Sequence, residues 1–309
     1  MTKALVTGGA GFIGSNVARL LVEEGRDVTV LDSLVTGYEK NLAGLRGVSL
    51  VRGDVRDAAL VAKLAEGASV VFHFAASVGN TRSIESPFED SEVNILGTLS
   101  VLEAARTACV RKVVYSSSAA IFGELRRLPI DEAHPAEPDS PYGVSKLAGE
   151  KHCLAYSRLH DIEAVCLRYF NVYGVNQRYD AYGNVIPIFV HRMLRGQSLL
   201  VYGDGEQTRD FVNVRDVARA NLLAARAEGV SGAFNIASGE AITVNQLVAL
   251  LREASGGDLK VEYAPPRKGD VMHSRADISA ARALLGYEPA IGMAEGLSEY
   301  LEWAGGELA

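Results

Sequence analysis

The feature that most constrains this chain is a glycine-rich turn between an apolar run and an amphipathic run. Residues 3–7 (KALVT) have the pattern of a buried strand, and residues 8–14 (GGAGFIG) follow at once. Apolar residues then recur at helical spacing as far as Glu24, and a second apolar run, 27–31, ends at Asp32. Strand, glycine turn, helix, strand and acid in this order predict a βαβ unit that binds a dinucleotide.

The same unit indicates which dinucleotide is bound. The glycines allow a pyrophosphate to approach backbone N–H groups at the helix N-terminus. The carboxylate of Asp32 would accept hydrogen bonds from the adenosine ribose and repel a 2′-phosphate, and Ser33 beside it brings no positive charge. These residues favour NAD over NADP. A glycine-rich turn without a ligand is the alternative for the motif taken alone.

Strand and helix patterns continue to alternate along the chain. At least six such units predict an α/β fold, a Rossmann-type doubly wound parallel sheet. After Arg168 the regularity breaks and Tyr, Asn, Gly and Pro become frequent. We therefore predict an NAD-binding domain, 1–167, to which the chain returns near 210–236, and a smaller C-terminal α/β lobe, 168–309, that binds substrate. The further strands are predicted at 48–52, 69–73, 111–116 and 162–167, and helices at 58–65 (capped by Asp57) and 88–107.

Composition excludes several classes of partner. The net charge of −7 argues against nucleic acid or an anionic membrane as a partner. No apolar stretch approaches the roughly 18 residues of a membrane span, and the first strand leaves no room for a signal peptide, so we predict a cytoplasmic protein. Cys109, Cys153 and Cys166 form no CxxC pair and are expected to be buried, reduced thiols. No metal site is predicted. His73 lies inside an apolar strand and is expected to be a hydrogen-bonded core residue.

A candidate for proton transfer lies at residues 140–146 (SPYGVSK). Ser140 suits a helix N-cap and Pro141 the first helical position. Tyr142 and Lys146 then lie one turn apart on the same face. Because an ammonium favours phenolate, we expect Lys146 to lower the pKa of Tyr142 into a range useful for general-base catalysis. An exposed helix that happens to carry both residues is the alternative for the spacing alone.

Several motifs occur in a recognisable order. After the glycine fingerprint come Ser118, the Tyr142/Lys146 pair, RYFNVYG at 168–174, RDF at 209–211 and RKGD at 267–270. Over essentially its whole length the chain resembles the extended short-chain dehydrogenase/reductases that act on nucleotide sugars, and within that family the UDP-glucose 4-epimerases. The resemblance implies an NAD-dependent isomerase, usually a homodimer, that interconverts UDP-glucose and UDP-galactose through a transient 4-keto sugar.

The resemblance also implies roles for individual residues. Tyr142, Lys146 and Ser118 match the catalytic positions, and Lys146 is also expected to bond the nicotinamide ribose. The cofactor positions are Gly8, Gly11, Phe12, Ile13, Gly14, Asp32, Ser33, Asp54, Val55, Phe74, Ala75, Ala76, Asn94, Ser116, Tyr142, Lys146 and Phe170. The substrate positions are Ser118, Tyr142, Asn171, Asn184, Tyr202, Arg209, Arg267, Asp270 and Ser274. Arginine suits a diphosphate because its planar, permanently charged fork binds phosphate oxygens, although surface charge is the alternative for each arginine.

Three departures from relatives refine the expected reaction. Ala119 and Ala120 stand where sugar-nucleotide dehydratases carry an Asp-Glu pair, so we expect oxidation and re-reduction without dehydration. Ser274 is small where some 4-epimerases carry a Tyr, so we expect the N-acetylhexosamine pair to be accepted as well. Val78 replaces a lysine that some epimerases place near the cofactor phosphates.

Two other functions are compatible with these motifs. A UDP-glucuronate/galacturonate 4-epimerase would share them and would need further donors for the sugar carboxylate, for which Thr81, Arg82 and Ser83 are candidates. A non-catalytic NAD(H)-sensing protein is a remote alternative, because Ser118, Tyr142 and Lys146 are all intact.

Overall fold

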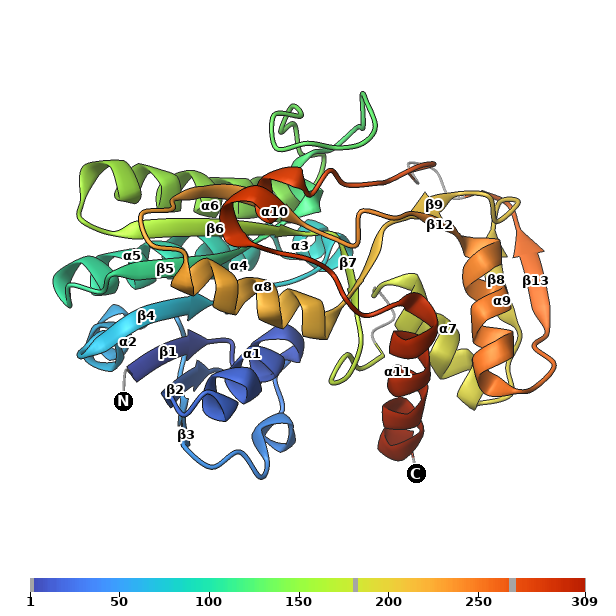
Figure 1. Cartoon of the computed structure of the whole chain (residues 1–309), viewed down its shortest axis with the longest axis horizontal. Coiled ribbons are helices and arrows are strands. Elements are labelled where there is room, and N and C mark those ends of the chain that lie inside the picture. The colour runs from blue at the N-terminus through green and yellow to red at the C-terminus, as the bar shows by residue number, and fades with distance from the viewer. Residues whose placement is uncertain (1–2, 180–182, 267–270, 309) are drawn as a thin grey trace.

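The structure is a computed structural model that describes residues 3–179, 183–266 and 271–308. Its larger half is built on a seven-stranded sheet in the order β11-β6-β5-β4-β1-β2-β3, in which every pair of neighbours is parallel (Figure 1). The predicted Rossmann-type parallel sheet is confirmed. The strands are β1 (Lys3–Thr7), β2 (Asp27–Asp32), β3 (Val48–Arg52), β4 (Ala68–His73), β5 (Lys112–Ser118), β6 (Glu163–Tyr169) and β11 (Gly232–Ile236).

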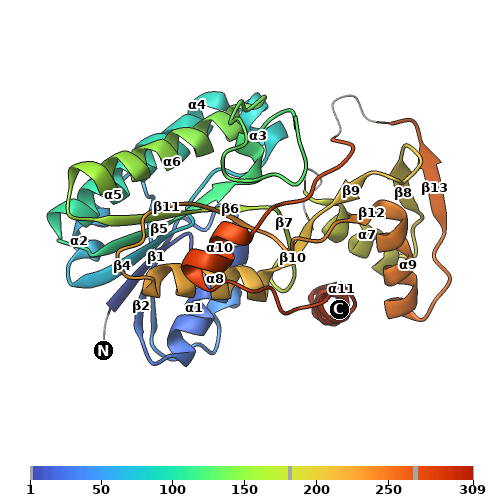
Figure 2. The ribbon, with the colours of Figure 1, turned by 45° about the horizontal axis from the view of Figure 1, so that its top comes forward.

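Helices cover both faces of this sheet (Figure 2). One face carries α1 (Phe12–Glu23), α8 (Val214–Arg226) and α10 (Ser279–Leu285), and the other carries α2 (Ala58–Ala65), α5 (Gly97–Thr107) and α6 (Pro141–Leu159). Successive residues of β1 show why the strands are apolar throughout. Ala4 and Val6 belong to the core under α1 and α8, whereas Leu5 belongs to the core under α2 and α5. A strand buried on both faces reads as a continuous apolar run.

The helical region predicted at 88–107 consists of three segments. These are α4 (Pro87–Ser91), a π-helical turn η2 (Glu92–Leu96) and α5, and the short helix α3 (Asn80–Glu85) precedes them. π-helical turns are often found at functional sites. This one carries Asn94 and changes the direction in which the side chains of α4 and α5 point.

Among its described residues, the smaller half contains short pairs of strands and the helices α7, α9 and α11. A third apolar core joins these elements and is separate from the two cores of the sheet. The short strands β7 (Asn171–Tyr173) and β10 (Phe211–Asn213) pair in parallel between the halves. The other elements are α7 (Val185–Leu194), β8 (Leu199–Tyr202), β9 (Thr208–Arg209), β12 (Ile242–Thr243), α9 (Val244–Ser255), β13 (Val261–Ala264), α11 (Met293–Leu308), and the 3₁₀ turns η1 (Glu39–Leu42) and η3 (Ala119–Ile121). Because the chain crosses between the halves several times, the division at residues 167/168 stays a prediction.

Predictions about individual core residues are mostly confirmed. His73 is 1% exposed and its ring nitrogens lie 2.7 Å from Thr7 Oγ1 and 3.0 Å from Thr98 Oγ1. Cys153 and Cys166 are buried. The prediction for Cys109 is wrong, because this residue is exposed. It lies in the turn after α5 with a left-handed φ of 54°, where the backbone reverses toward β5 and directs the side chain outward.

Within the part of the chain that the structure describes, no helix is long and apolar enough to cross a membrane. The same residues contain no cluster of His, Cys, Asp or Glu side chains that would hold a metal ion.

Candidate active site

The carboxyl edge of the large sheet begins with the glycine turn after β1. Gly8 has a φ of +68°, and a Cβ at this position would lie 2.5 Å from the backbone N of Ala75. A Cβ at Gly14 would lie 2.3 Å from the carbonyl oxygen of Gly8. The turn, α1 and the end of β4 are thus in backbone contact, which only glycine permits. This packing leaves the first N–H groups of α1, at Phe12 and Ile13, at the sheet edge, and the arrangement fits a pyrophosphate.

The acid at the end of β2 completes this end of the site. Asp32 is 7% exposed, and its Oδ2 and Oδ1 accept hydrogen bonds from the backbone N–H groups of Ala10 (2.9 Å) and Leu34 (2.8 Å). Each carboxylate oxygen has a further lone pair that can accept a ribose hydroxyl. Gly37 packs on the carboxylate, since a Cβ there would lie 2.7 Å from Oδ1. Ser33 is exposed beside it. These residues fit the adenosine end of NAD.

The next strands bring further predicted cofactor residues to the same edge. The N–H of Phe74 donates to the carbonyl of Thr7 at 2.9 Å, which holds the segment of Phe74, Ala75 and Ala76 against the glycine turn. Val55 is buried against Gly97, where a Cβ would lie 2.6 Å from it.

Asp54 follows β3 at this edge, but its carboxylate is already paired with Arg56. The guanidinium donates to Asp54 at 2.7 and 2.9 Å and lowers the pKa of the carboxyl. The side chain of Asp54 therefore helps to orient this loop, and its predicted contact with the cofactor stays a prediction.

The three predicted catalytic residues come from two elements that touch at the end of β5. Ser140 caps α6 by accepting the N–H of Gly143 at 3.2 Å, and Ser83 accepts the N–H of Tyr142 at 3.0 Å. The phenol of Tyr142 lies beside Ser118, whose hydroxyl lowers the pKa of the phenol and whose Oγ accepts the N–H of Ala120 at 3.1 Å. The structure thus brings Ser118 and Tyr142 together, and their roles in catalysis remain predictions.

The expected effect of Lys146 on Tyr142 is wrong in this structure. Burial raises the pKa of Tyr142 to about 12, and the nearby hydroxyl of Ser118 offsets only part of this rise. Lys146 is 3% exposed and its Nζ lies 4.7 Å from the ring centroid of Tyr115, a cation–π contact. Burial lowers the pKa of Lys146 to about 8. The charge that acts on Tyr142 is the carboxylate of Asp90, and it raises the pKa of the phenol.

Asn94 is buried in the π-helical turn and all of its polar atoms are bonded to protein. Its Nδ2 donates to the carbonyl of Ser77 (3.0 Å), to Asp90 Oδ1 (3.0 Å) and to Ser145 Oγ (2.9 Å), and its Oδ1 accepts the N–H of Ser77 (2.8 Å). The predicted cofactor residue thus holds the loop after β4 against α6. Asp90 and Ser145 were not predicted from the sequence, although Asp90 lies four residues before Asn94 and Ser145 lies between Tyr142 and Lys146.

A buried ion pair supports the end of β5. Glu150, which is fully buried on α6, accepts hydrogen bonds from Arg168 at 2.7 and 3.0 Å and from Ser117 Oγ at 2.7 Å. The pair was missed because the sequence places the two charges 18 residues apart on different elements. Ser116, predicted at the cofactor, hydrogen-bonds with Tyr169.

The predicted substrate residues gather around β9 and β10 in part. Asn171 donates to the carbonyl of Asp210 at 3.1 Å, and Arg209 Nη1 donates to the carbonyl of Thr208 at 2.9 Å. The N–H of Ser274, which is 9% exposed, donates to the same Thr208 carbonyl at 3.2 Å. Three segments that are far apart in sequence therefore meet here.

The other predicted residues have separate positions. Phe170 is buried, with its N–H bonded to the carbonyl of Ile236 at 3.1 Å. Asn184 is exposed at the start of α7, and Tyr202 is half-buried at the end of β8. Arg267 and Asp270 lie outside the described residues.

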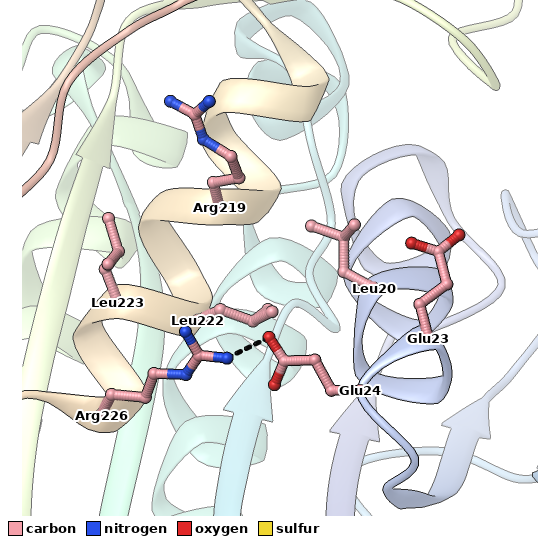
Figure 3. Close-up of a pocket in the computed structure, with 7 residues that line it drawn as sticks. All are labelled: Leu20, Glu23, Glu24, Arg219, Leu222, Leu223 and Arg226. Atoms are coloured by element: carbon pink, nitrogen blue, oxygen red, sulfur yellow. Dashed lines mark hydrogen bonds and ion pairs between the residues drawn. The ribbon is translucent and has the colours of Figure 1, made fainter.

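A hollow of about 370 Å³ lies elsewhere, between α1 and α8 (Figure 3). It is near the last turn of α1, whereas the glycine turn is at the opposite end of that helix, and no predicted site residue lines it. Arg226 of α8 bonds Glu24 across it, and its lining residues are Leu20, Glu23, Glu24, Arg219, Leu222, Leu223 and Arg226.

Known proteins resemble this chain over its whole length. Residues 4–237 match the family described as "NAD dependent epimerase/dehydratase family". A putative UDP-glucose 4-epimerase from Methanocaldococcus jannaschii is 42% identical over 301 residues, which cover 97% of each chain. The crystal structure of a Thermotoga maritima UDP-glucose 4-epimerase with UDP-glucose gives a TM-score of 0.94 at 38% identity and covers 100% of both chains. A UDP-N-acetylglucosamine 4-epimerase from Methanobrevibacter ruminantium M1, in complex with UDP-N-acetylmuramic acid, gives 0.94 at 34% identity and covers 98% of this chain and 97% of that one.

Proposed function

Since the chain belongs to the NAD-dependent epimerase/dehydratase family, we propose that it is a UDP-hexose 4-epimerase that interconverts UDP-glucose and UDP-galactose. The predicted family and its dependence on NAD are confirmed by the matches along the chain. The hexose and the roles of individual residues are parts of this proposal.

One observation carries the choice of reaction. The hydroxyl of Ser118 lies close enough to the phenol of Tyr142 to lower its pKa, and the two residues after Ser118 are Ala119 and Ala120 in the turn η3. A tyrosine and a serine can hold and move the proton of one sugar hydroxyl. Alanine methyl groups can neither donate nor accept the further protons that dehydration of the sugar requires. The geometry therefore supports reversible oxidation at carbon 4 and disfavours dehydration.

In the proposed reaction, Tyr142 acts as a phenolate, which the positive charge of bound NAD⁺ would favour against the effect of burial. It takes the proton of the sugar 4-hydroxyl, which Ser118 orients. NAD, when bound, supplies the acceptor and later the donor of the hydride at carbon 4. Tyr142 keeps the proton until the opposite face of the 4-keto sugar is presented, and then returns it. Proton and hydride are both returned, so the cofactor is not consumed. Gly8, Gly14 and Asp32 would hold the cofactor.

Inversion requires that the sugar turns over without leaving. Arg209, the last residue of β9, and Asn171, the first residue of β7, would bind the diphosphate; Asn171 bonds the carbonyl of Asp210, the neighbour of Arg209. Arg267 is predicted to do the same. Anchoring the diphosphate keeps the keto sugar close to Tyr142, so that its re-reduction remains an intramolecular event.

The proposal is tested by incubating the purified protein with UDP-galactose, without added NAD, and following the products by NMR. We expect UDP-glucose to form, and bound nicotinamide to be partly reduced when substrate is added. Reduction without any inverted sugar, or release of a dehydrated sugar, would contradict a 4-epimerase.

Ser274 supports acceptance of N-acetylated sugars because its side chain is small and it lies near Arg209. The N–H of Ser274 and Nη1 of Arg209 both donate to the carbonyl of Thr208. Ser274→Tyr should lower the ratio of activity on UDP-N-acetylglucosamine to activity on UDP-glucose by about tenfold or more, the effect of a steric clash of 1–3 kcal/mol. Ser255→Tyr, at an exposed serine of α9, is the control. An unchanged ratio in Ser274→Tyr would refute this part of the proposal.

The uronate alternative receives less support. Ser83 was a candidate donor for a sugar carboxylate, but its hydroxyl accepts the N–H of Tyr142 and donates to the carbonyl of Asn80 at 2.7 Å. Arg82 Nη1 donates to the carbonyl of Val78 at 3.0 Å. Both side chains therefore take part in folding the α3 segment. Preferential turnover of UDP-glucuronate in the same assay would favour the alternative.

We also propose that two copies pair through the helices around α6. Exposed apolar side chains occur on these neighbouring elements: Ile84 of α3, Phe88 of α4, Leu96 of η2 and Val144 of α6, of which Phe88 is 85% exposed. Phe88→Asp should shift the protein from dimer to monomer in analytical ultracentrifugation. Leu284→Asp, at an exposed leucine of α10, is the control and should not. A wild-type monomer would refute the pairing.

A further inference from the structure

A buried acid beside the candidate catalytic helix has no part in the reaction described above. Asp90 of α4 is 0% exposed. Its Oδ1 accepts a hydrogen bond from Asn94 at 3.0 Å, whereas its Oδ2 is buried and has no hydrogen-bond partner within residues 3–179, 183–266 and 271–308. A buried carboxylate oxygen without a partner costs free energy, so its presence calls for an explanation.

Ser145 connects this acid to the helix of Tyr142 and Lys146. Its Oγ accepts from Asn94 Nδ2 at 2.9 Å and donates to the carbonyl of Tyr142 at 3.1 Å, and it lies beside Asp90, whose pKa it lowers. Asn94 thus links Asp90 to Ser145 and so to α6. The held carboxylate faces both Tyr142 and Lys146, and its charge acts on each of them.

Other ionisable groups also face the ammonium of Lys146. His73 is kept neutral because burial lowers its pKa to about 3. Burial also holds the pKa of Tyr115 and of Cys166 well above their ordinary values, so both stay neutral near pH 7. Three groups raise the pKa of Lys146 by their charge, namely Cys153 of α6, Asp90 of α4 and Cys166 of β6, and Asp90 is the carboxylate among them. His73 of β4 and Tyr115 of β5 also face the ammonium.

We propose that Asp90 is a positioning residue for the proposed epimerase reaction: it holds Asn94 and Ser145, and its carboxylate keeps the buried Lys146 protonated. The charge of Asp90 is needed because Lys146 is buried. Burial already lowers the pKa of this lysine to about 8, so without the charge of Asp90 the ammonium would be lost near neutral pH. A role in supplying charge to the lysine explains why a buried carboxylate is kept with Oδ2 unpartnered. The same charge raises the pKa of Tyr142, so Asp90 sets both ends of the pH range in which the pair works.

The first experiment titrates Lys146 directly and needs no substrate. Purified protein with its own bound cofactor is labelled with ¹³Cε-lysine, and the Lys146 signal, assigned with Lys146→Arg, is followed by NMR between about pH 6 and 11. In Asp90→Asn we expect the titration to move to lower pH by about one unit, the usual effect of losing a close opposite charge. Asparagine fits because its oxygen still accepts from Asn94 while its NH₂ takes the place of the unpartnered Oδ2. Glu89→Gln, which makes the same charge change at the exposed neighbouring residue, should leave the titration in place.

Two further variants separate charge from packing. Asp90→Glu keeps the charge and should titrate as the wild type does, even where its activity falls. Asp90→Thr is a second neutral variant, whose hydroxyl can accept from Asn94, and it decides the matter if Asp90→Asn does not fold. In each neutral variant the pH profile of turnover should move to lower pH on both sides.

The outcomes distinguish this inference from the proposed function. A Lys146 titration that is unchanged in Asp90→Asn or Asp90→Thr would overturn the inference, as would an equal shift in Asp90→Glu. A wild-type protein that fails to interconvert UDP-galactose and UDP-glucose would overturn the proposed function, and the titration would still report whether Asp90 controls Lys146.

Discussion

The two halves of the molecule assemble their parts of the candidate site in different ways. In the larger half, most predicted cofactor residues end a strand or follow it by a few positions, as Asp32 ends β2 and Gly8 follows β1, whereas Asn94, Tyr142 and Lys146 lie on helical segments. Parallel strands bring all such positions to one edge. In the smaller half, Asn171, Arg209 and Ser274 come from distant segments that meet through backbone hydrogen bonds. Local sequence therefore specifies the cofactor end, whereas long-range contacts specify the substrate end.

Asp210 shows how long-range contacts hold the substrate end of the smaller half together. Its carboxylate is fully buried and accepts hydrogen bonds from Ser238 N (2.9 Å), Ser238 Oγ (2.7 Å), Gly239 N (3.1 Å) and Ala276 N (3.1 Å). One side chain thus ties the loop after β11 and the segment after Ser274 to Arg209. At the glycine turn a single bond from Ala10 N to the carboxylate of Asp32 (2.9 Å) adds to the close backbone packing.

The largest effect is expected from Tyr142→Phe, which removes the proton-transfer group and leaves the cofactor end intact. Turnover should fall about 1,000-fold, the usual contribution of a general acid–base group, while the amount of NAD bound to the purified protein stays unchanged. Tyr156→Phe, on the same helix, is the control and should retain turnover. If Tyr142→Phe lost its NAD as well, the separation between cofactor and proton-transfer residues would be refuted.

Lys146→Met tests the electrostatics of the same half. The pKa of Lys146 is lowered to about 8 in the folded protein against 10.5 for an ordinary lysine. The folded state therefore binds fewer protons, and wild-type stability rises with pH between about 8 and 10.5. Methionine removes the cost of the buried charge, so the variant should be more stable than the wild type below pH 8, by up to about 3 kcal/mol, and should lose this advantage by pH 10.5. Equal free energies of unfolding for both proteins at pH 7 and at pH 10.5, from urea titrations, would contradict this.

Gly14→Ala tests the backbone contact at the glycine turn. The added Cβ would lie 2.3 Å from the carbonyl oxygen of Gly8, so the turn must shift. We expect a loss of about 2 kcal/mol, the typical cost of overpacking, seen as a lower Tm and a lower NAD content. Gly305→Ala, in α11 where a Cβ would meet no atom within 4 Å, should not lower either value. If Gly14→Ala kept its full NAD content, the close backbone contact at the glycine turn would not be required for cofactor binding.

Asp210→Asn should have the smallest effect and should be confined to the substrate end. The NH₂ of asparagine cannot accept the N–H groups that one carboxylate oxygen now binds. One such loss costs about 1.4 kcal/mol, so KM for the UDP-sugar should rise about tenfold with the NAD content unchanged. Asp204→Asn, at an exposed acid of the same half, is the control. A fall in NAD content in Asp210→Asn would mean that the two ends are coupled.

The accuracy of the sequence predictions follows the same division. The positions of the first six strands, the caps Asp57 and Ser140, and the burial of His73 were predicted because each depends on neighbours within a few residues, although β5 and β6 end two residues later than predicted. The pKa of Tyr142 was predicted in the wrong direction. Its i, i+4 neighbour Lys146 packs on Tyr115 of β5, and an acid from α4 faces the phenol instead.

The sequence by itself determined the order of the elements, the parallel sheet, the family and the positions that reach the sheet edge, because these follow from periodicity and spacing along the chain. Tertiary structure alone decided which charges meet. The pairing of Glu150 with Arg168, the contact of Asp90 with Ser145 and the four bonds to Asp210 all join separate elements. In a buried site the ionisation of a side chain depends on desolvation and on such neighbours, which no spacing along the chain specifies. The glycine turn could therefore be predicted from residues 8–14, whereas the pKa of Tyr142 depends on residues that only the fold brings together.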